Sequence, residues 1–241
     1  MASDYDPKAE RDRLILEAVA YATHGLLFGF GFLPSRHRPK RAREIRTLVF
    51  VHGLGATRAS FFPMQGYLGL LRHTRQLSFN YRAAAGIEAA AIELKRRIDR
   101  DVRGGRIDLI GHSIGGLVAR FYLQQLGGQR RVDRLITIGA PHQGTHASVY
   151  VPTRAVSDLH PGCSFLRKLD ALPPPDVRCL SIALGRDLMV LPAENAHAPF
   201  GERLTFDDLG HLDALLSPRV FNAVDQFLKE PLPAASSPDA A

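Results

Sequence analysis

The stretch "RIDLIGHSIGGLVARFYLQQLGG", residues 106–128, decides the fold. Its apolar run at 107–110 indicates a buried strand, and the apolar residues at helical spacing from 117 onward indicate a helix. Between them, Gly111-His112-Ser113-Ile114-Gly115 places a serine at a tight strand-to-helix turn. In that context the G-x-S-x-G spacing favours a nucleophilic serine over a serine that only caps the helix.

The composition is that of one ordinary globular domain, with 45% hydrophobic and 23% charged residues in a chain of 241. The net charge is +7, and the densest basic run is "RHRPKRAREIR", residues 36–46. A nucleic-acid-binding protein usually spreads basic residues over a helix or groove, so we expect a solvated or membrane-facing linker and no nucleic acid partner. The two cysteines, Cys163 and Cys179, form no metal-binding motif.

From Thr47 onward, short apolar strands alternate with helices, which predicts an α/β fold with a mainly parallel sheet and helices on both faces. Besides the strand and helix around Ser113, the expected strands are at 47–53, 76–82, the start of 132–145, and 177–187, and the expected helices are at 84–103 and 218–228. The expected organisation is an N-terminal apolar segment and basic linker at 1–46, a domain at 47–230 and a disordered tail at 231–241.

Residues 144–175 contain no clear strand, and a loop of this length without a function is uncommon in a compact domain. They follow the carboxyl end of a predicted strand, which is where ligands bind in open α/β sheets. We therefore expect a short cap or binding loop at about 144–175.

The N-terminal segment at 14–34 is mostly apolar, but acidic residues precede it and no small-x-small cleavage site follows it. Three hypotheses remain open: a helix packed on the domain, an interfacial helix, and a membrane span flanked by the basic linker. Gly25, Gly29 and Gly31 weaken any continuous helix. We expect a cytoplasmic or peripherally membrane-associated protein without a cleavable signal peptide, with a membrane surface as a candidate partner of residues 14–46.

A serine hydroxyl is a poor nucleophile near neutral pH, so a histidine base must take its proton. His211 lies between the last predicted strand and the closing helix, where a loop can return to Ser113. The side chain of His112, next to the serine in the turn, is expected to point elsewhere. His52 and His142 are interpreted as residues that shape loops.

An acid must orient that base, and in this chain order it should follow a strand between Ser113 and His211. Asp187 does so, just past a glycine turn, and Asp208 is the alternative. The developing oxyanion needs two backbone donors, for which the amides of Ile114 and Leu54 are predicted.

Five motifs in this order and spacing resemble the α/β-hydrolase superfamily: "VFVHGLGA", "LIGHSIGGLVARFYLQ", "RLITIGAPHQGT", "ALGRDLMV" and "GHLDALLSP". Within it, residues 47–228 are similar to bacterial triacylglycerol lipases and to the related inositol-deacylase-like and lecithin-acyltransferase-like esterases. The resemblance implies ester hydrolysis with Ser113, Asp187 and His211 as a triad and Leu54 and Ile114 as oxyanion donors. It also implies that residues 157–169 belong to an acyl-binding cap.

A lipase of this kind often binds calcium through an aspartate two residues after the catalytic histidine. Asp213 matches that position, but Ser217 stands where a glutamine is expected. We therefore expect no cofactor or metal and keep calcium as an alternative. The expected function is a serine carboxylester hydrolase acting on lipid-like acyl esters; an acyltransferase with the same triad and a catalytically silent binding protein are the alternatives.

Overall fold

Six parallel strands form one sheet in the computed structural model, which describes residues 7–33, 46–71, 75–102, 104–150 and 159–232. The mainly parallel sheet predicted from the sequence is confirmed. Most of the basic linker, residues 151–158 of the expected cap and the expected tail from 233 lie outside the described residues. The strands run in the order β2 (Arg75–Ser78), β1 (Thr47–Val51), β3 (Ile107–His112), β4 (Val132–Ile138), β5 (Arg178–Leu184) and β6 (Glu202–Phe206).

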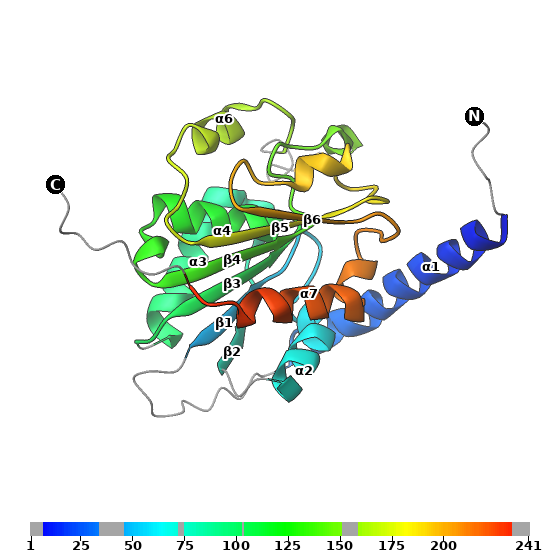
Figure 1. The fold of residues 1–241 in the computed structure, drawn as a ribbon, viewed down its shortest axis with the longest axis horizontal. Helices are drawn as coiled ribbons and strands as arrows, with labels where there is room; N and C mark the ends of the chain where they lie inside the picture. Colours follow the sequence, from blue (N-terminus) through cyan, green and yellow to red (C-terminus); the bar gives the residue numbers. More distant parts are fainter. Residues whose placement is uncertain (1–6, 34–45, 72–74, 103, 151–158, 233–241) are drawn as a thin grey trace.

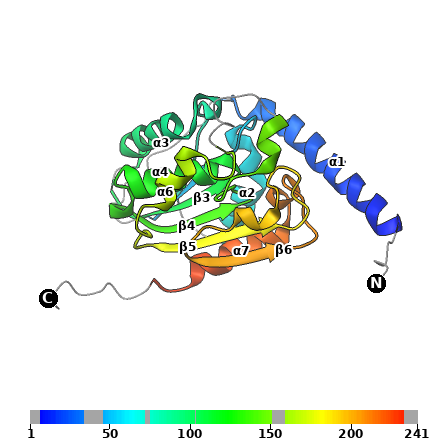
Figure 2. The ribbon, with the colours of Figure 1, turned by 90° about the horizontal axis from the view of Figure 1, so that it is seen from above.

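Helices cover both faces of this sheet, as predicted. Figure 2 shows α3 (Ile87–Asp101) and α4 (Ile114–Gln125) on one side of the sheet and α7 (Pro218–Lys229) on the other. The short helix α6 (Ser164–Asp170) packs with the first pair, and α2 (Phe62–Leu71) packs with α7. Because both faces are covered, the central strands β1, β3 and β4 are buried along their whole length.

Neither α2 nor β6 is predicted from the sequence. In β6 only Leu204 and Phe206 are partly buried, because it is an edge strand whose other residues face solvent. Two apolar residues are too few to show the alternation of a strand. In α2, Gly66 and Gly69 lower the helix propensity, and the helix is stabilised by packing against α7 instead.

The N-terminal apolar segment forms α1 (Pro7–Phe30), a helix that leaves the domain toward its N-terminal end (Figure 1). Gly25 and Gly29 lie inside this helix and do not interrupt it. Its C-terminal half contacts two short 3₁₀ helices of the domain, η1 (Arg58–Phe61) and η6 (Asp213–Leu215), and these contacts outweigh the low propensity of glycine. In the part of the chain that the structure describes, no helix has the length and apolar character needed to cross a membrane.

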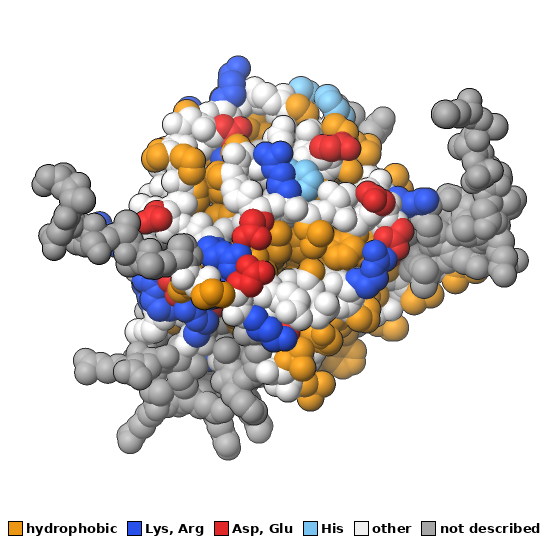
Figure 3. Space-filling view, in the orientation of Figure 1, with side chains coloured by type: hydrophobic (Ala, Val, Ile, Leu, Met, Phe, Trp, Pro, Cys, Tyr) orange, Lys and Arg blue, Asp and Glu red, His pale blue; other side chains and the backbone are white. Residues whose placement is uncertain are grey.

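One face of α1 carries an apolar stripe that no described residue covers, made of Ile15, Val19, Leu26 and Phe30. Intervals of four, seven and four residues place these side chains on the same side of a helix. Each is more than half exposed, and Leu26 is 75% exposed. Figure 3 shows hydrophobic side chains along the lower edge of the helix. We call this surface the exposed stripe of α1.

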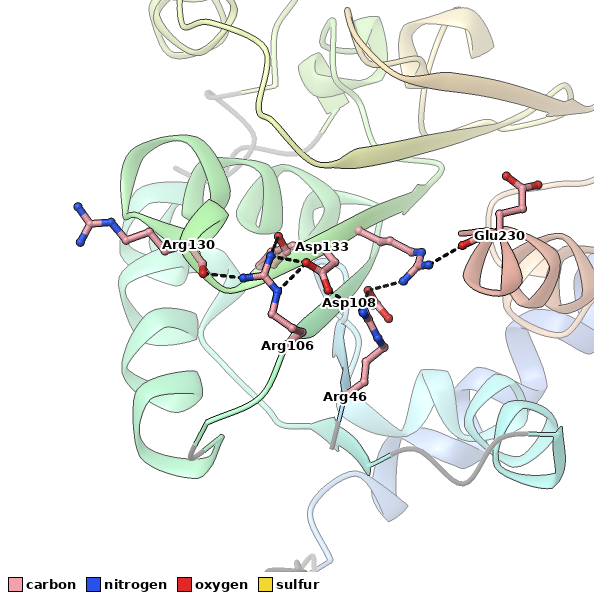
Figure 4. Close-up of polar contacts among 8 residues, drawn as sticks. Arg46, Arg106, Asp108, Arg130, Asp133 and Glu230 are labelled. Carbon is pink, nitrogen blue, oxygen red and sulfur yellow. Dashed lines mark hydrogen bonds and ion pairs between the residues drawn. The ribbon is translucent and has the colours of Figure 1, made fainter. Parts of the chain in front are cut away.

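A charge network holds the amino-terminal edge of the sheet, at the opposite end from the serine turn (Figure 4). Arg46 forms ion pairs of 2.7 Å with both Asp108 and Asp133. Arg134 lies 3.4 Å from Asp108 and donates to the backbone carbonyl of Glu230 at 2.6 Å. Burial raises the pKa of Asp108, and the two arginines beside it oppose that effect. The network fastens the start of β1 and the end of α7 to the central strands.

Candidate active site

Ser113 lies at the carboxyl end of β3 in a backbone conformation that glycine adopts easily and other residues do not, with φ 55° and ψ −135°. No other non-glycine residue among those described has a positive φ. The flanking glycines make this turn possible. A Cβ on Gly115 would lie 2.2 Å from the carbonyl oxygen of Val51, and a Cβ on Gly111 would lie 2.6 Å from the Cα of Gly116. The strand and the helix thus touch at the serine.

The structure brings the predicted base and the predicted acid together. His211 Nδ1 lies 2.7 Å from Asp187 Oδ2, and both side chains are buried. The other carboxylate oxygen, Oδ1, accepts hydrogen bonds from the amides of Met189 at 2.7 Å and Val190 at 2.9 Å. These two donors fix the carboxylate, so that only Oδ2 faces the imidazole. The arrangement holds the Nδ1–H tautomer and leaves Nε2 free to act as a base.

The alternative acid, Asp208, is exposed and pairs with Arg219 at 2.6 Å, so it is Asp187 whose carboxylate contacts the imidazole. Room for this contact comes from Gly139, directly after β4. A Cβ on Gly139 would lie 3.2 Å from both Asp187 Oδ2 and His211 Nδ1. The sequence does not reveal that Gly139 makes room for this contact. The only signal there is that a glycine stands at the end of a predicted strand.

His112 also belongs to the site, although the sequence indicates only that its side chain points away from the serine. It is buried, and its Nε2 lies 3.0 Å from the backbone carbonyl oxygen of His211. Burial, reinforced by the nearby His211, holds the pKa of His112 well below its usual range. The neutral ring therefore donates its Nε2–H to that carbonyl and positions the loop that carries His211.

A second histidine, from α1, reaches the same loop. His24 Nε2 lies 3.3 Å from the carbonyl oxygen of Leu212, and burial lowers the pKa of His24. The backbone carbonyls of two consecutive residues, His211 and Leu212, thus each face a histidine ring. His52 and His142 make local contacts, with Gly53 O at 2.8 Å and Thr137 Oγ1 at 2.9 Å, in agreement with their interpretation as loop-shaping residues.

Leu54 and Ile114, whose amides are the predicted oxyanion donors, line the same cavity as Ser113. Ile114 opens α4, and the first amides of a helix have no carbonyl partner within it. Leu54 lies in the loop after β1, which approaches the serine closely because residue 53 is a glycine. A Cβ on Gly53 would lie 2.8 Å from the Cβ of Ser113.

The serine, the predicted base and the predicted oxyanion donors line one cavity of about 620 Å³, a size ordinary for a small-molecule site. Ser113, His211, Leu54 and Ile114 line it, together with residues from α1. None of the described residues that line the cavity is an aspartate, glutamate, lysine or arginine. The walls are mostly apolar, so the cavity fits an uncharged, hydrophobic group.

The expected cap contributes to this cavity at Thr145, Ala147, Ser148 and Leu159. The helix α6, by contrast, turns its apolar residues Phe165, Leu166 and Leu169 into the domain core. Residues 157 and 158 of the implied acyl-binding segment lie outside the described residues.

Asp213, where the resemblance would place a calcium ligand, accepts the backbone N–H of Gly210 at 3.1 Å. Across the described ranges, no group of three or more histidine, cysteine, aspartate or glutamate side chains gathers in a way that could hold a metal ion. Cys163 and Cys179 are not joined by a disulfide.

Many solved structures share this fold at low sequence identity. A lipase of Bacillus licheniformis, BlEst2 in its mature form, is 18% identical, with a TM-score of 0.59 over 81% of this chain and 95% of that chain. Lipase B of Aspergillus fumigatus is 15% identical, with a TM-score of 0.70 over 83% of this chain and 56% of that chain. An enol-lactonase from Burkholderia xenovorans LB400 is 16% identical, with a TM-score of 0.55 over 79% and 94% of the two chains.

A search of the curated proteins finds no match to this sequence. The family described as "Domain of unknown function (DUF7379)" matches residues 31–183. That match includes β1, the serine turn and most of β5, and it ends before Asp187 and His211. The chain therefore belongs to the DUF7379 family, and it has the α/β-hydrolase fold of the lipases, esterases and lactonase that resemble it in structure.

Proposed function

We propose that this protein is a serine carboxylester hydrolase that acts on lipid-like acyl esters through an acyl-enzyme. The observation that carries the proposal is the buried Asp187–His211 pair, joined at 2.7 Å, whose histidine lines the same apolar cavity as a serine on a strained turn. Serine activation requires these three groups, in these roles. The lipases that resemble the chain in fold carry names that agree with this activity.

In the first half of the reaction, Ser113 Oγ attacks the carbonyl carbon of the ester while His211 Nε2 takes the hydroxyl proton. The carbonyl oxygen becomes an oxyanion, which the amides of Leu54 and Ile114 stabilise by hydrogen bonds. The tetrahedral intermediate then collapses. The bond to the alcohol oxygen breaks, His211 returns the proton to the departing alcohol, and Ser113 is left as an acyl ester.

In the second half, His211 takes a proton from a water molecule, whose oxygen attacks the acyl carbon. Collapse of the second intermediate releases the carboxylic acid, and His211 returns the proton to Ser113. Asp187 remains ionised throughout, because its role is to orient the imidazole and to stabilise its cation. Its two backbone donors keep it in the geometry that this role requires.

The substrate class follows from the cavity walls. The described part of the wall is mostly apolar and carries no Asp, Glu, Lys or Arg side chain, which favours an uncharged acyl chain over a charged group, because an unpaired charge is costly to desolvate. An acyltransferase would use the same steps with an alcohol in place of water, so the products distinguish the two activities. A silent binding protein would leave the serine unreactive.

The test is a series of p-nitrophenyl esters of increasing acyl length, run on the wild type and on Ser113→Ala. The wild type should release p-nitrophenol and should be labelled by a fluorophosphonate. Ser113→Ala should lose both reactions, with turnover reduced by roughly 10³-fold or more. Normal turnover in Ser113→Ala would disprove the proposal, and product analysis with added alcohol would reveal a transferase.

A further inference from the structure

We propose that α1 forms the wall of the cavity that limits the length of the substrate's acyl chain. This inference rests on the proposed ester hydrolysis at Ser113. It assigns to α1 a role in acyl binding, which the resemblance implies only for residues 157–169. The evidence is the face that α1 turns toward the cavity, the contacts that hold the helix there, and the open space beside one of its glycines.

Four residues of α1 line the same cavity as Ser113 and His211: Tyr21, His24, Gly25 and Phe28. Their intervals of three, one and three residues place them on one face of a helix. The exposed stripe of α1 lies on a different side. The helix therefore contributes a continuous surface to the cavity, made of two aromatic rings, one imidazole and the backbone of Gly25.

The end of α1 is fixed in this position by hydrogen bonds to the carbonyls of Phe28, in its last turn, and of Gly31, the residue directly after it. Thr57 Oγ1 donates to the carbonyl of Phe28 at 3.3 Å, and Arg58 Nε donates to that of Gly31 at 2.9 Å. Asn80 Nδ2 also donates to the carbonyl of Gly31, at 3.0 Å. These three donors come from Thr57, Arg58 and Asn80, so they tie the end of the helix to the domain.

The backbone of α1 also lies close to the domain at this point. A Cβ on Gly31 would lie 2.2 Å from Thr57 Oγ1, so a larger residue there would push the helix away. Thr57 follows the loop of Leu54, and His24 contacts Leu212, the residue after His211. The wall is thus joined to both loops that carry the proposed chemistry, which keeps it at a set distance from the reacting atoms.

Gly25 leaves the wall open where a side chain would narrow the cavity. A Cβ built on Gly25 meets no atom within 4 Å, so a side chain at this position begins in free space. Gly29 has the same free space around its Cβ, but it does not line the cavity. Because both glycines lie within α1, leucine at either position raises the helix propensity equally, and only leucine at 25 takes up cavity volume.

The experiment compares Gly25→Leu, Gly29→Leu and the wild type on p-nitrophenyl acetate and decanoate, with Ser113→Ala as the reference for lost chemistry. The readout is the ratio of kcat/KM for decanoate to kcat/KM for acetate. We expect Gly25→Leu to lower this ratio about tenfold or more, since one or two methylenes in an apolar pocket have an effect of that size. Gly29→Leu should keep the ratio within about twofold of the wild type. Thermal melts should show both variants at least as stable as the wild type.

An unchanged ratio in Gly25→Leu would overturn the inference while leaving the proposed function intact, provided that Ser113→Ala is inactive. An equal change in both leucine variants would overturn it as well, because the effect would then come from the helix and not from the cavity. The same holds if Gly25→Leu loses acetate turnover as strongly as decanoate turnover. Ester turnover by Ser113→Ala would instead remove the proposed function itself.

Discussion

Replacing Asp187 by asparagine tests the orientation of the proposed catalytic imidazole of His211 directly, because the structure dictates how the new amide must lie. Its oxygen has to keep facing the two amides that Oδ1 now accepts, at 2.7 and 2.9 Å. The reversed amide would set its NH₂ group against two buried donors and leave them unsatisfied, at about 1–3 kcal/mol each. The NH₂ group therefore faces His211 Nδ1.

A donor at that place forces His211 Nδ1 to accept, so the ring proton moves to Nε2 and the base is lost. We expect kcat to fall by about 10⁴-fold, as a wrong tautomer in such a triad does. That factor corresponds to about 5 kcal/mol of transition-state stabilisation. The KM should change little, since Asp187 does not line the cavity.

The assay is steady-state hydrolysis of a short p-nitrophenyl ester, with a thermal melt to show that the variant is folded. Asp208→Asn is the matched control: it removes the same charge from an exposed aspartate, and kcat should stay within about twofold of the wild type. If Asp187→Asn keeps kcat within about tenfold of the wild type, or if Asp208→Asn loses activity instead, the assignment of the acid is wrong.

Three further outcomes can be measured on the same protein. Burial lowers the pKa of both His112 and His142 well below 6.5. The stability that depends on their neutral form should therefore be complete above pH 6.5 and be lost progressively at lower pH. A melting temperature that stays constant from pH 7 down to about 5 would refute this. Asp108→Ala leaves the buried Arg134 without this partner, so urea titration should show a loss of about 3–5 kcal/mol in the free energy of unfolding. A loss under about 1 kcal/mol would contradict the stabilising role of the charge network. For the exposed stripe of α1 we propose a lipid surface as partner, so the protein should sediment with anionic vesicles in a salt-sensitive way. Leu26→Ser should weaken this sedimentation without lowering the melting temperature. Equal sedimentation of the wild type and the variant would count against a role of the stripe in lipid binding.

The sequence correctly predicts those features that depend on residues close to one another in the chain. The turn at Ser113 needs glycine at 111 and 115 because a Cβ at either place would strike backbone, and such a requirement is visible within five residues. The buried strands are predicted well for the same reason, since each is a short apolar run with a clear end. The helices at 87–101 and 218–229 likewise show their buried faces in the spacing of their own residues.

Contacts between distant parts of the chain decide the rest. His112 contacts the backbone of a residue 99 positions away, and His24 contacts one 188 positions away, so neither role is visible in the neighbouring sequence. The choice of Asp187 over Asp208 depends on which carboxylate the fold brings to the imidazole. Tertiary packing places α1 beside the cavity: Thr57 binds the carbonyl of Phe28 in its last turn, and Arg58 and Asn80 bind that of Gly31 directly after it. The backbone conformation of a tight turn depends on adjacent residues, so the sequence reveals it. A cavity wall made by segments that lie far apart in the chain forms only after those segments pack together.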